Sequence, residues 1–383
     1  MRLFISLIIV VFFSNPIKAQ NEENTVKETP KVELHGALRY NYKLASWKDS
    51  SKERGGDFGY DMFAISPKAY FKGLTLDVEY RLYAVEFGSG LLRRGDITYS
   101  FNDNNYIKVG LTKVPFGIEP YNSHSYYLGM GYYMGLEDDY DMGVRFSHQD
   151  ETFEYQIAFF KNSEEMLFGD KSQQSNKRYS YDVIGVNRET NQINGKLVYK
   201  INRKQFKHRI GGSAMYGGLY NSDSDKMGNH SALAFHYELT ANAFNLKTQV
   251  TTFKKNPKNV NATENSIVSL GAYNLDYELA SKGELYTIGA SYNFPINNRV
   301  IDNIQLYNNY AYFDKSKKEF EDSTSNTIGI LFHAGNIYSY IEYIIAENQP
   351  WFGSEWTKAF SSGNLDTSIK KEQLFNINIG YYF

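Results

Sequence analysis

The acidic run around residue 140 is the densest group of side chains that could do chemistry. Glu137, Asp138 and Asp139 are consecutive, and Asp141 follows after one tyrosine. Carboxylate oxygens are the ligands that Ca²⁺ prefers, so the run is a candidate cation site. It lacks the spacing and the glycine of an EF-hand loop, which favours the alternative of a solvated or wall-paired acidic patch. We therefore predict no bound metal and no cofactor.

The remaining side chains form no catalytic pattern. The seven histidines show no H-E-x-x-H spacing, and no Walker or Rossmann glycine pattern occurs. Cysteine is absent, which excludes disulfides and thiolate metal sites. The net charge of −2 argues against nucleic acid, whose partners normally carry a basic excess. We predict that the protein is not an enzyme and does not bind nucleic acid.

The elements that would position these residues are β-strands, because most of the chain alternates polar and apolar residues. Val32, Leu34 and Leu38 fall on one face of the first segment, with Arg39 and Lys43 on the other. In an outer-membrane barrel the apolar face meets lipid and the charged face lines water, whereas in a soluble protein the apolar face would be core. Sixteen segments follow this grammar: 31–44, 62–71, 74–82, 92–101, 106–112, 141–146, 152–160, 193–201, 208–219, 231–239, 244–252, 285–294, 304–312, 327–332, 337–345 and 373–383.

Two segments are less regular. Pro67 lies inside the second segment, where a closed barrel has no free edge to accommodate a residue without an N–H. Residues 267–279 also alternate weakly, and we assign them to a loop because the strand number would otherwise be odd. Gly110 lies within the fifth segment, whose Ile107, Val109 and Leu111 should share a face.

The connections alternate between short turns and longer loops, as in outer-membrane barrels. The longest loops follow the fifth, seventh, eleventh and fifteenth segments. We predict an all-β fold: a transmembrane antiparallel up-and-down β-barrel of about 16 strands, with long extracellular loops and short periplasmic turns.

Composition and the N-terminus favour the membrane alternative over a soluble secreted β protein. The chain has 33 Tyr and 26 Phe, yet its mean hydropathy is −0.50. Such barrels gather aromatic rings at both membrane interfaces and enclose a polar lumen. Residues 1–19, with Arg2, an apolar stretch and Ala19, read as a signal peptide rather than an anchor. Residues 20–30 read as a flexible periplasmic lead-in and 31–383 as the barrel, placed in the cell outer membrane of a Gram-negative bacterium among lipid and lipopolysaccharide.

The alternation also predicts which charges face the lumen. The basic ones are Arg39, Lys43, Arg81, Lys108, Arg145, Lys196, Lys200, Arg209 and Lys247, and the acidic ones include Glu33, Asp77, Glu79, Asp141, Glu154 and Glu238. The loop 115–140 either reaches the extracellular rim or folds into the lumen, and it carries Glu119, Glu137, Asp138 and Asp139. Folded inward, it would oppose the basic wall and create a transverse field at a constriction. The alternative is that these charges are ordinary solvated lining.

The start of this loop resembles the strand-to-loop motif of the phosphate-selective porin O and P family. The matching positions are Gly110, Lys113, Pro115, Phe116, Gly117 and Glu119, whereas Leu111-Thr112 departs from the Gln-Phe of that family. The resemblance implies a homotrimeric barrel whose third loop enters the lumen, and it implies anion passage. The last strand ends on Phe383 and resembles the signal that the barrel-assembly machinery recognises.

The expected function is that of a porin through which small hydrophilic solutes and ions diffuse passively. The inward loop and the basic wall would set its selectivity. Two alternatives stay open: an anion- or phosphate-selective channel, and a non-conducting structural or adhesive barrel closed by its own loops.

Overall fold

The computed structural model describes residues 30–166, 169, 172–296, 298, 300–363 and 371–383. The chain divides into the units Met1–Pro30 and Lys31–Phe383. The predicted signal peptide and all but the last residue of the lead-in lie outside the described residues.

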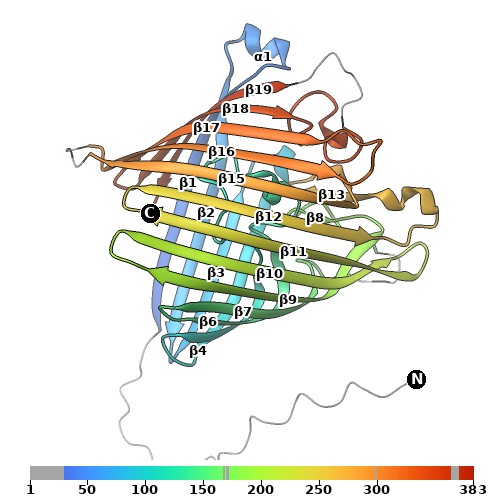
Figure 1. Cartoon of the computed structure of the whole chain (residues 1–383), viewed down its shortest axis with the longest axis horizontal. Coiled ribbons are helices and arrows are strands. Elements are labelled where there is room, and N and C mark those ends of the chain that lie inside the picture. The colour runs from blue at the N-terminus through green and yellow to red at the C-terminus, as the bar shows by residue number, and fades with distance from the viewer. Residues whose placement is uncertain (1–29, 167–168, 170–171, 297, 299, 364–370) are drawn as a thin grey trace, which may run out of the picture. The chain divides into compact units, whose positions relative to one another are not determined.

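The second unit is a closed antiparallel barrel of 16 strands, with each strand beside its barrel neighbour (Figure 1). Pairing of β1 with β19 closes it, with Tyr40 opposite Ile379. The strands are β1 Lys31–Ala45, β2 Asp57–Phe71, β3 Leu74–Leu82, β4 Gly90–Ser100, β5 Asn105–Lys113, β6 Tyr140–Gln149, β7 Phe153–Asn162, β9 Asn187–Asn202, β10 Phe206–Asn221, β11 Lys226–Ala241, β12 Phe244–Asn256, β15 Lys282–Pro295, β16 Asn303–Lys315, β17 Ser323–Ala334, β18 Ile337–Glu347 and β19 Glu372–Tyr382. The predicted fold class is confirmed, and each of the sixteen predicted segments corresponds to one barrel strand.

A small three-stranded sheet lies apart from the barrel ladder. It consists of β8 Asp182–Val183, β13 Ile267–Ala272 and β14 Leu275–Ala280, in the order β14-β13-β8. We call it the inner sheet. The assignment of 267–279 to a connection outside the barrel is therefore correct, although this connection forms a hairpin of its own.

Helical segments are short and all lie in connections. They are α1 Asp49–Glu53, α2 Met130–Tyr133, η1 Val85–Phe87, η2 Ala262–Ser266 and η3 Trp356–Lys358. In the part of the chain that the structure describes, none of the helices combines the length and the apolar character needed to cross a membrane.

Side chains sort to the two barrel faces in the sense opposite to a soluble protein. On β1, Val32 and Leu34 are 67% and 57% exposed, whereas Asn41 is buried. On β19, Ile379 is exposed and Asn376 and Asn378 are fully buried. An outward apolar surface with inward polar side chains suits a strand between hydrocarbon and an aqueous or polar interior. The apolar residues of β1 and β19 that would form the core of a soluble β-sandwich therefore lie on the outer surface of the barrel.

The irregularities at Pro67 and Gly110 are accommodated locally. Pro67 pairs with Leu34 of β1, but the β2–β3 ladder has no pair at Ser66 and Pro67, where an N–H is missing. Gly110 takes a φ of +127°, and the expected face of Leu111 is wrong: Leu111 is buried instead of exposed like Val109. The alternation of side chains between the two faces of a strand is broken where the backbone leaves the extended region.

The tight turns, the start of β1 and the end of β19 lie at one end of the barrel. The β2–β3 turn is Lys72-Gly73, with φ values of 50° and 80°, the left-handed pair of a type I′ hairpin. At the other end the long connections follow β5, β7, β12 and β18, as predicted, while 222–225 between β10 and β11 is short.

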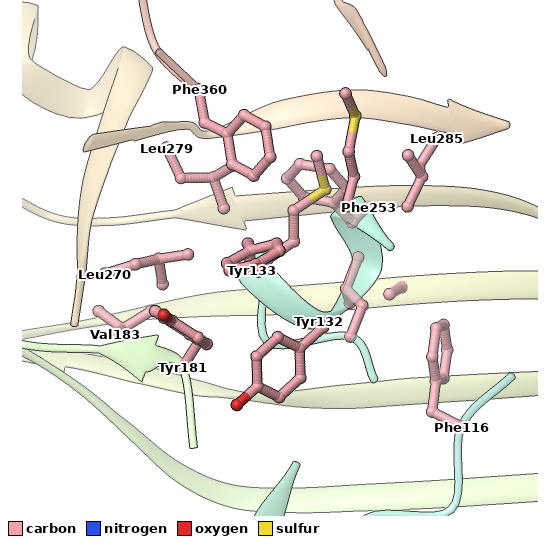
Figure 2. Close-up of a cluster of buried hydrophobic side chains, with 14 of the residues drawn as sticks. Phe116, Tyr132, Tyr133, Tyr181, Val183, Phe253, Leu270, Leu279, Leu285 and Phe360 are labelled. Atoms are coloured by element: carbon pink, nitrogen blue, oxygen red, sulfur yellow. The ribbon is translucent and has the colours of Figure 1, made fainter. Parts of the chain in front are cut away.

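An apolar cluster of buried side chains fills part of the interior. It joins residues of the β5–β6 connection, the inner sheet and the inward faces of β7, β10, β11, β12, β15 and β16. Figure 2 shows Tyr132 and Tyr133 of α2 among Tyr181, which precedes β8, Leu270 of the inner sheet and Leu285 of β15. This part of the lumen is packed like a protein core.

Candidate functional site in the lumen

The connection Val114–Asp139, which we call the inner loop, lies across the barrel interior. Its residues from Val114 to Ile118 are buried, as are those of α2. Its backbone N–H groups donate to inward side chains of β10, β12, β16 and β18: Gly117 to Ser213 Oγ (2.9 Å), Ile118 to Gln249 Oε1 (2.9 Å), His124 to Asn309 Oδ1 (3.1 Å) and Tyr126 to Glu342 Oε1 (2.7 Å). Strands on widely separated parts of the wall therefore hold the loop in place.

The motif residues shape the start of the inner loop. Gly110 allows close strand approach, since a Cβ there would lie 2.4 Å from the carbonyl oxygen of Gly95. Gly117 has a φ of +59°, and its Cβ would lie 2.5 Å from Gln249 Oε1. Pro115 and Phe116 are buried, Phe116 in the apolar cluster. Lys113 and Glu119, the two charged motif residues, each enter a different charge cluster.

The first charge cluster surrounds Asp138, and we call it the Arg93 cluster. The Arg93 guanidinium donates to both Asp138 oxygens (2.9 and 3.0 Å) and to Glu79 Oε2 (3.1 Å), and Lys113 Nζ lies 3.1 Å from Asp138 Oδ1. Arg81 Nε lies 2.6 Å from Glu79 Oε1. Burial alone would raise the pKa of Asp138, but the nearby Arg93 and Lys113 lower it well below its ordinary value.

Arg93 and Arg94 were not predicted to face the lumen. Tyr80 pairs with Leu92 and Glu79 with Arg94, so β4 carries one extra residue at this point. Such a bulge turns two successive side chains to one face. The bulge shifts the phase of the alternation between the exposed Leu92 and Ile97, and the adjacent pair of arginines was the other signal in the sequence.

The second charge cluster, which we call the Glu119 cluster, ties the inner loop to β6, β7, β9, β10 and β11. Lys196 Nζ lies 2.5 Å from Glu119 Oε2, and Arg145 Nη1 lies 3.8 Å from Glu119 Oε1. The Lys196 side chain is fully buried. Burial opposes the charge on Glu119, yet Lys196, Lys113 and Arg145 lower its pKa to about 2.

The Glu119 cluster continues along the wall through acidic and basic side chains in alternation. Lys196 Nζ also lies 3.7 Å from Glu154 Oε1, and Arg209 Nη2 lies 2.7 Å from Glu154 Oε2. Arg209 Nε lies 3.4 Å from Glu238 Oε2. Each charge in this chain thus has a partner of opposite sign.

Three other predicted lumen residues, Arg39, Lys108 and Lys200, lie apart from these two clusters. Arg39 Nε lies 2.8 Å from Asp61 Oδ2, and Lys108 Nζ lies 3.0 Å from Asp96 Oδ1. Lys200 donates to the backbone oxygen of Asp150 in a short turn. These three residues pair with neighbouring wall or turn groups, and none of these contacts joins them to the inner-loop acids.

The remaining two acids of the run have different partners. Glu137 accepts from the backbone N–H of Asn122 (2.9 Å), and burial raises its pKa to about 7. Asp139 offers its backbone oxygen to the N–H of Val114 (2.9 Å), while burial raises the pKa of its carboxyl. The acidic run is thus buried inside the barrel, and its members face different surroundings.

A cavity of about 490 Å³ lies beside the inner loop, on the side of the short turns. It is lined by Lys113, Glu119, Pro120, Gln149, Glu154, Arg209 and Glu238. The lining carries both signs of charge, and its volume is in the range of small-molecule sites. The space can hold water and small polar solutes, whereas the apolar cluster occupies the region nearer the long loops.

Solved structures of outer-membrane proteins share this fold over nearly the whole chain. OmpT of Vibrio cholerae is 13% identical with a TM-score of 0.56, and the match covers 94% of this chain and all of OmpT. An anion-selective porin from Comamonas acidovorans is 11% identical with a TM-score of 0.60, covering 93% of this chain and all of that one. The outer-membrane channel DcaP of Acinetobacter baumannii is 12% identical with a TM-score of 0.57, covering 92% and 97%.

The comparisons by sequence give no relative. No family model matches the chain, and no curated protein matches it. At 11–13% identity the structural likeness establishes the barrel fold of outer-membrane porins and channels. The finer resemblance to the phosphate-selective porin O and P family stays a prediction.

Proposed function

We propose that this protein is a channel of the Gram-negative outer membrane through which small hydrophilic solutes and ions diffuse passively. The observation that carries the proposal is the inner loop, which crosses the lumen beside a charged cavity of about 490 Å³. The outward apolar rows of β1 and β19 meet lipid, and the polar interior offers a path for water. The inner loop would form the constriction.

The charges that line the cavity support weak selectivity between cations and anions rather than a preference for anions. Lys113 and Arg209 face Glu119, Glu154 and Glu238, so neither sign dominates the lining. A field between such opposed charges orients dipolar solutes and disfavours apolar ones. The alternative of an anion- or phosphate-selective channel draws support from the motif at Gly110–Glu119.

The C-terminal strand and the outer surface of the barrel suggest partners for assembly. Phe383 is 47% exposed, and its backbone exchanges hydrogen bonds with Gly36 of β1 (2.9 and 3.0 Å). We propose that the barrel-assembly machinery recognises this terminal strand. Outer-membrane lipid and lipopolysaccharide would surround the apolar surface, and we propose a homotrimer, the form named for one OmpT structure.

A second candidate function is a barrel that does not conduct. The apolar cluster favours it, because Phe253, Leu285 and Phe313 of the wall pack against the inner loop and the inner sheet. Such packing excludes water on the side of the long loops. In this case the barrel would serve a structural or adhesive role.

Planar-bilayer recording of the purified protein tests the proposal. Ion-conducting steps are expected, with reversal potentials in asymmetric KCl close to zero when selectivity is weak. Because the chain lacks cysteine, Gln149→Cys gives a single reactive site in the cavity lining, and Asp103→Cys in a short turn is the control. A charged thiol reagent should reduce the conductance of Gln149→Cys alone. A barrel that never conducts would refute the channel and favour the second candidate.

A further inference from the structure

Three aspartates converge inside the barrel, away from the cavity described above. Asp139 at the end of the inner loop, Asp141 of β6 and Asp182 of β8 each offer one carboxylate oxygen, and these oxygens lie within 4.8 Å of one another. Their exposed fractions are 8%, 2% and 4%. The three residues come from three different elements: the inner loop, the barrel wall and the inner sheet.

Each of these aspartates leaves a buried oxygen without a hydrogen-bond partner among the described residues. The orphaned atoms are Asp139 Oδ1, Asp141 Oδ1 and Asp182 Oδ2. In the described part of the chain, no basic side chain forms an ion pair with Asp139 or Asp141, and Arg178 Nη2 lies 3.4 Å from Asp182 Oδ2. Buried polar atoms almost always have a partner, so the two oxygens of Asp139 and Asp141 that lack both a hydrogen bond and an ion pair indicate an occupant at this point.

The surrounding charges do not supply that occupant. Lys255 is engaged by Glu189 at 2.5 Å, and Arg178 is shared between Asp182 and Glu164, whose Oε2 lies 3.6 Å from Arg178 Nε. His230 Nδ1 lies 3.7 Å from the same Glu189 oxygen. The region therefore holds five carboxylates and two permanently basic side chains. With all five carboxylates ionised, the buried negative charge would exceed the buried positive charge, which is strongly unfavourable without a further cation or a proton.

We propose that Asp139, Asp141 and Asp182 bind a hard divalent cation of the Ca²⁺ class. All three donors are carboxylate oxygens, the ligand type that Ca²⁺ takes, and cysteine, which Zn²⁺ sites often use, is absent from the chain. The ion neutralises the excess acid and joins the end of the inner loop and the inner sheet to β6. The site would thus fix the packed part of the interior to the barrel wall.

Terbium luminescence on the full-length barrel in detergent tests the site. Tb³⁺ substitutes for Ca²⁺, and its emission would be sensitised by Tyr140, between Asp139 and Asp141, and by Tyr181, next to Asp182. We expect one Tb³⁺ per chain, displaced by Ca²⁺ and not by equimolar Zn²⁺. Asp141→Asn should weaken binding at least about tenfold, the lower end of what loss of a supporting group costs a metal site. Asp276→Asn, an exposed aspartate of the inner sheet, is the matched control and should bind as the native chain does.

The main rival occupant is a proton shared between neighbouring carboxyl groups. It predicts no saturable Tb³⁺ emission, no Ca²⁺-dependent change in thermal stability after chelation of the native barrel, and an infrared band of protonated carboxyl groups that Asp139→Asn and Asp141→Asn both reduce. This set of results would overturn the proposal. The chelation experiment uses the native chain, so it decides the question even where a variant fails to fold.

Discussion

Replacing Glu119 with glutamine should detach the inner loop from the wall at one defined point. Glu119 holds the fully buried Lys196 at 2.5 Å and Arg145 at 3.8 Å. Glutamine keeps the size and the hydrogen bond from Gln156 Nε2 (3.1 Å), but it removes the charge. Lys196 would then keep only the 3.7 Å ion pair with Glu154.

Two routes give a similar magnitude for this loss. Breaking a buried ion pair from one side costs about 3–5 kcal/mol. The pKa of Glu119 falls from its ordinary value of 4.5 to about 2, and at 1.36 kcal/mol per pKa unit this shift corresponds to about 3 kcal/mol of stability at pH 7. Because the folded pKa is depressed, the contribution is present above pH 4.5. It is lost as the pH falls through about 2.

Urea unfolding of the detergent-folded barrel, followed by heat-modifiable gel migration, measures the effect. Glu119→Gln should lower the free energy of unfolding by about 3 kcal/mol at pH 7, and linkage reduces this difference to about 1.4 kcal/mol at pH 3. Glu151→Gln in an exposed short turn is the matched control, with an expected change within about 0.5 kcal/mol. A Glu119 variant as stable as the Glu151 variant, or a difference that does not shrink at pH 3, would refute the reasoning.

Three further predictions use urea unfolding, in detergent for the first two and in lipid bilayers for the third. Arg93→Gln leaves the buried Asp138 without its bidentate partner and should cost about 3–5 kcal/mol, so a loss below about 1 kcal/mol would contradict the Arg93 cluster. Gly117→Ala should cost about 1–2 kcal/mol because of its φ of +59°, and no loss would mean that the loop backbone adapts. Ile157→Lys, at a 60% exposed position of β7, should cost about 2–4 kcal/mol in a bilayer, whereas Val85→Lys at the long-loop end should be neutral; equal effects would count against lipid contact at Ile157.

The strands could be predicted because each barrel strand faces two different media. In β7 every second residue from Phe153 to Phe159 is exposed and apolar, which is the period-two pattern in its simplest form. The ends of strands were less accurate: β2 begins at Asp57 rather than at residue 62, because a β-bulge at Asp61 shifts the phase of the alternation. The inner sheet could not be predicted, since its β8 has two residues and depends on pairing with β13.

The candidate site was predictable in its residue types but not in its pairs. Alternation placed Lys196, Arg145 and Glu154 inward, and the loop was a candidate to enter the lumen. Glu119 and Lys196 are 77 positions apart, however, and only the folded barrel decides which basic residue meets which acid. Arg93 was not predicted to face the lumen because the bulge in β4 breaks the alternation on which that prediction rested.

The barrel interior is not lined by polar side chains throughout, so it is not a purely aqueous lumen. Leu285 and Phe313 face inward and are almost completely buried, so the inward faces of β15 and β16 are apolar near the inner sheet and polar elsewhere. Part of the lumen is thus a packed core, and a charged cavity lies on the side of the short turns. If docking of the inner loop limits passage, Glu119→Gln raises single-channel conductance as it lowers stability. If the apolar cluster closes the barrel by itself, the same variant loses stability while its conductance stays unchanged.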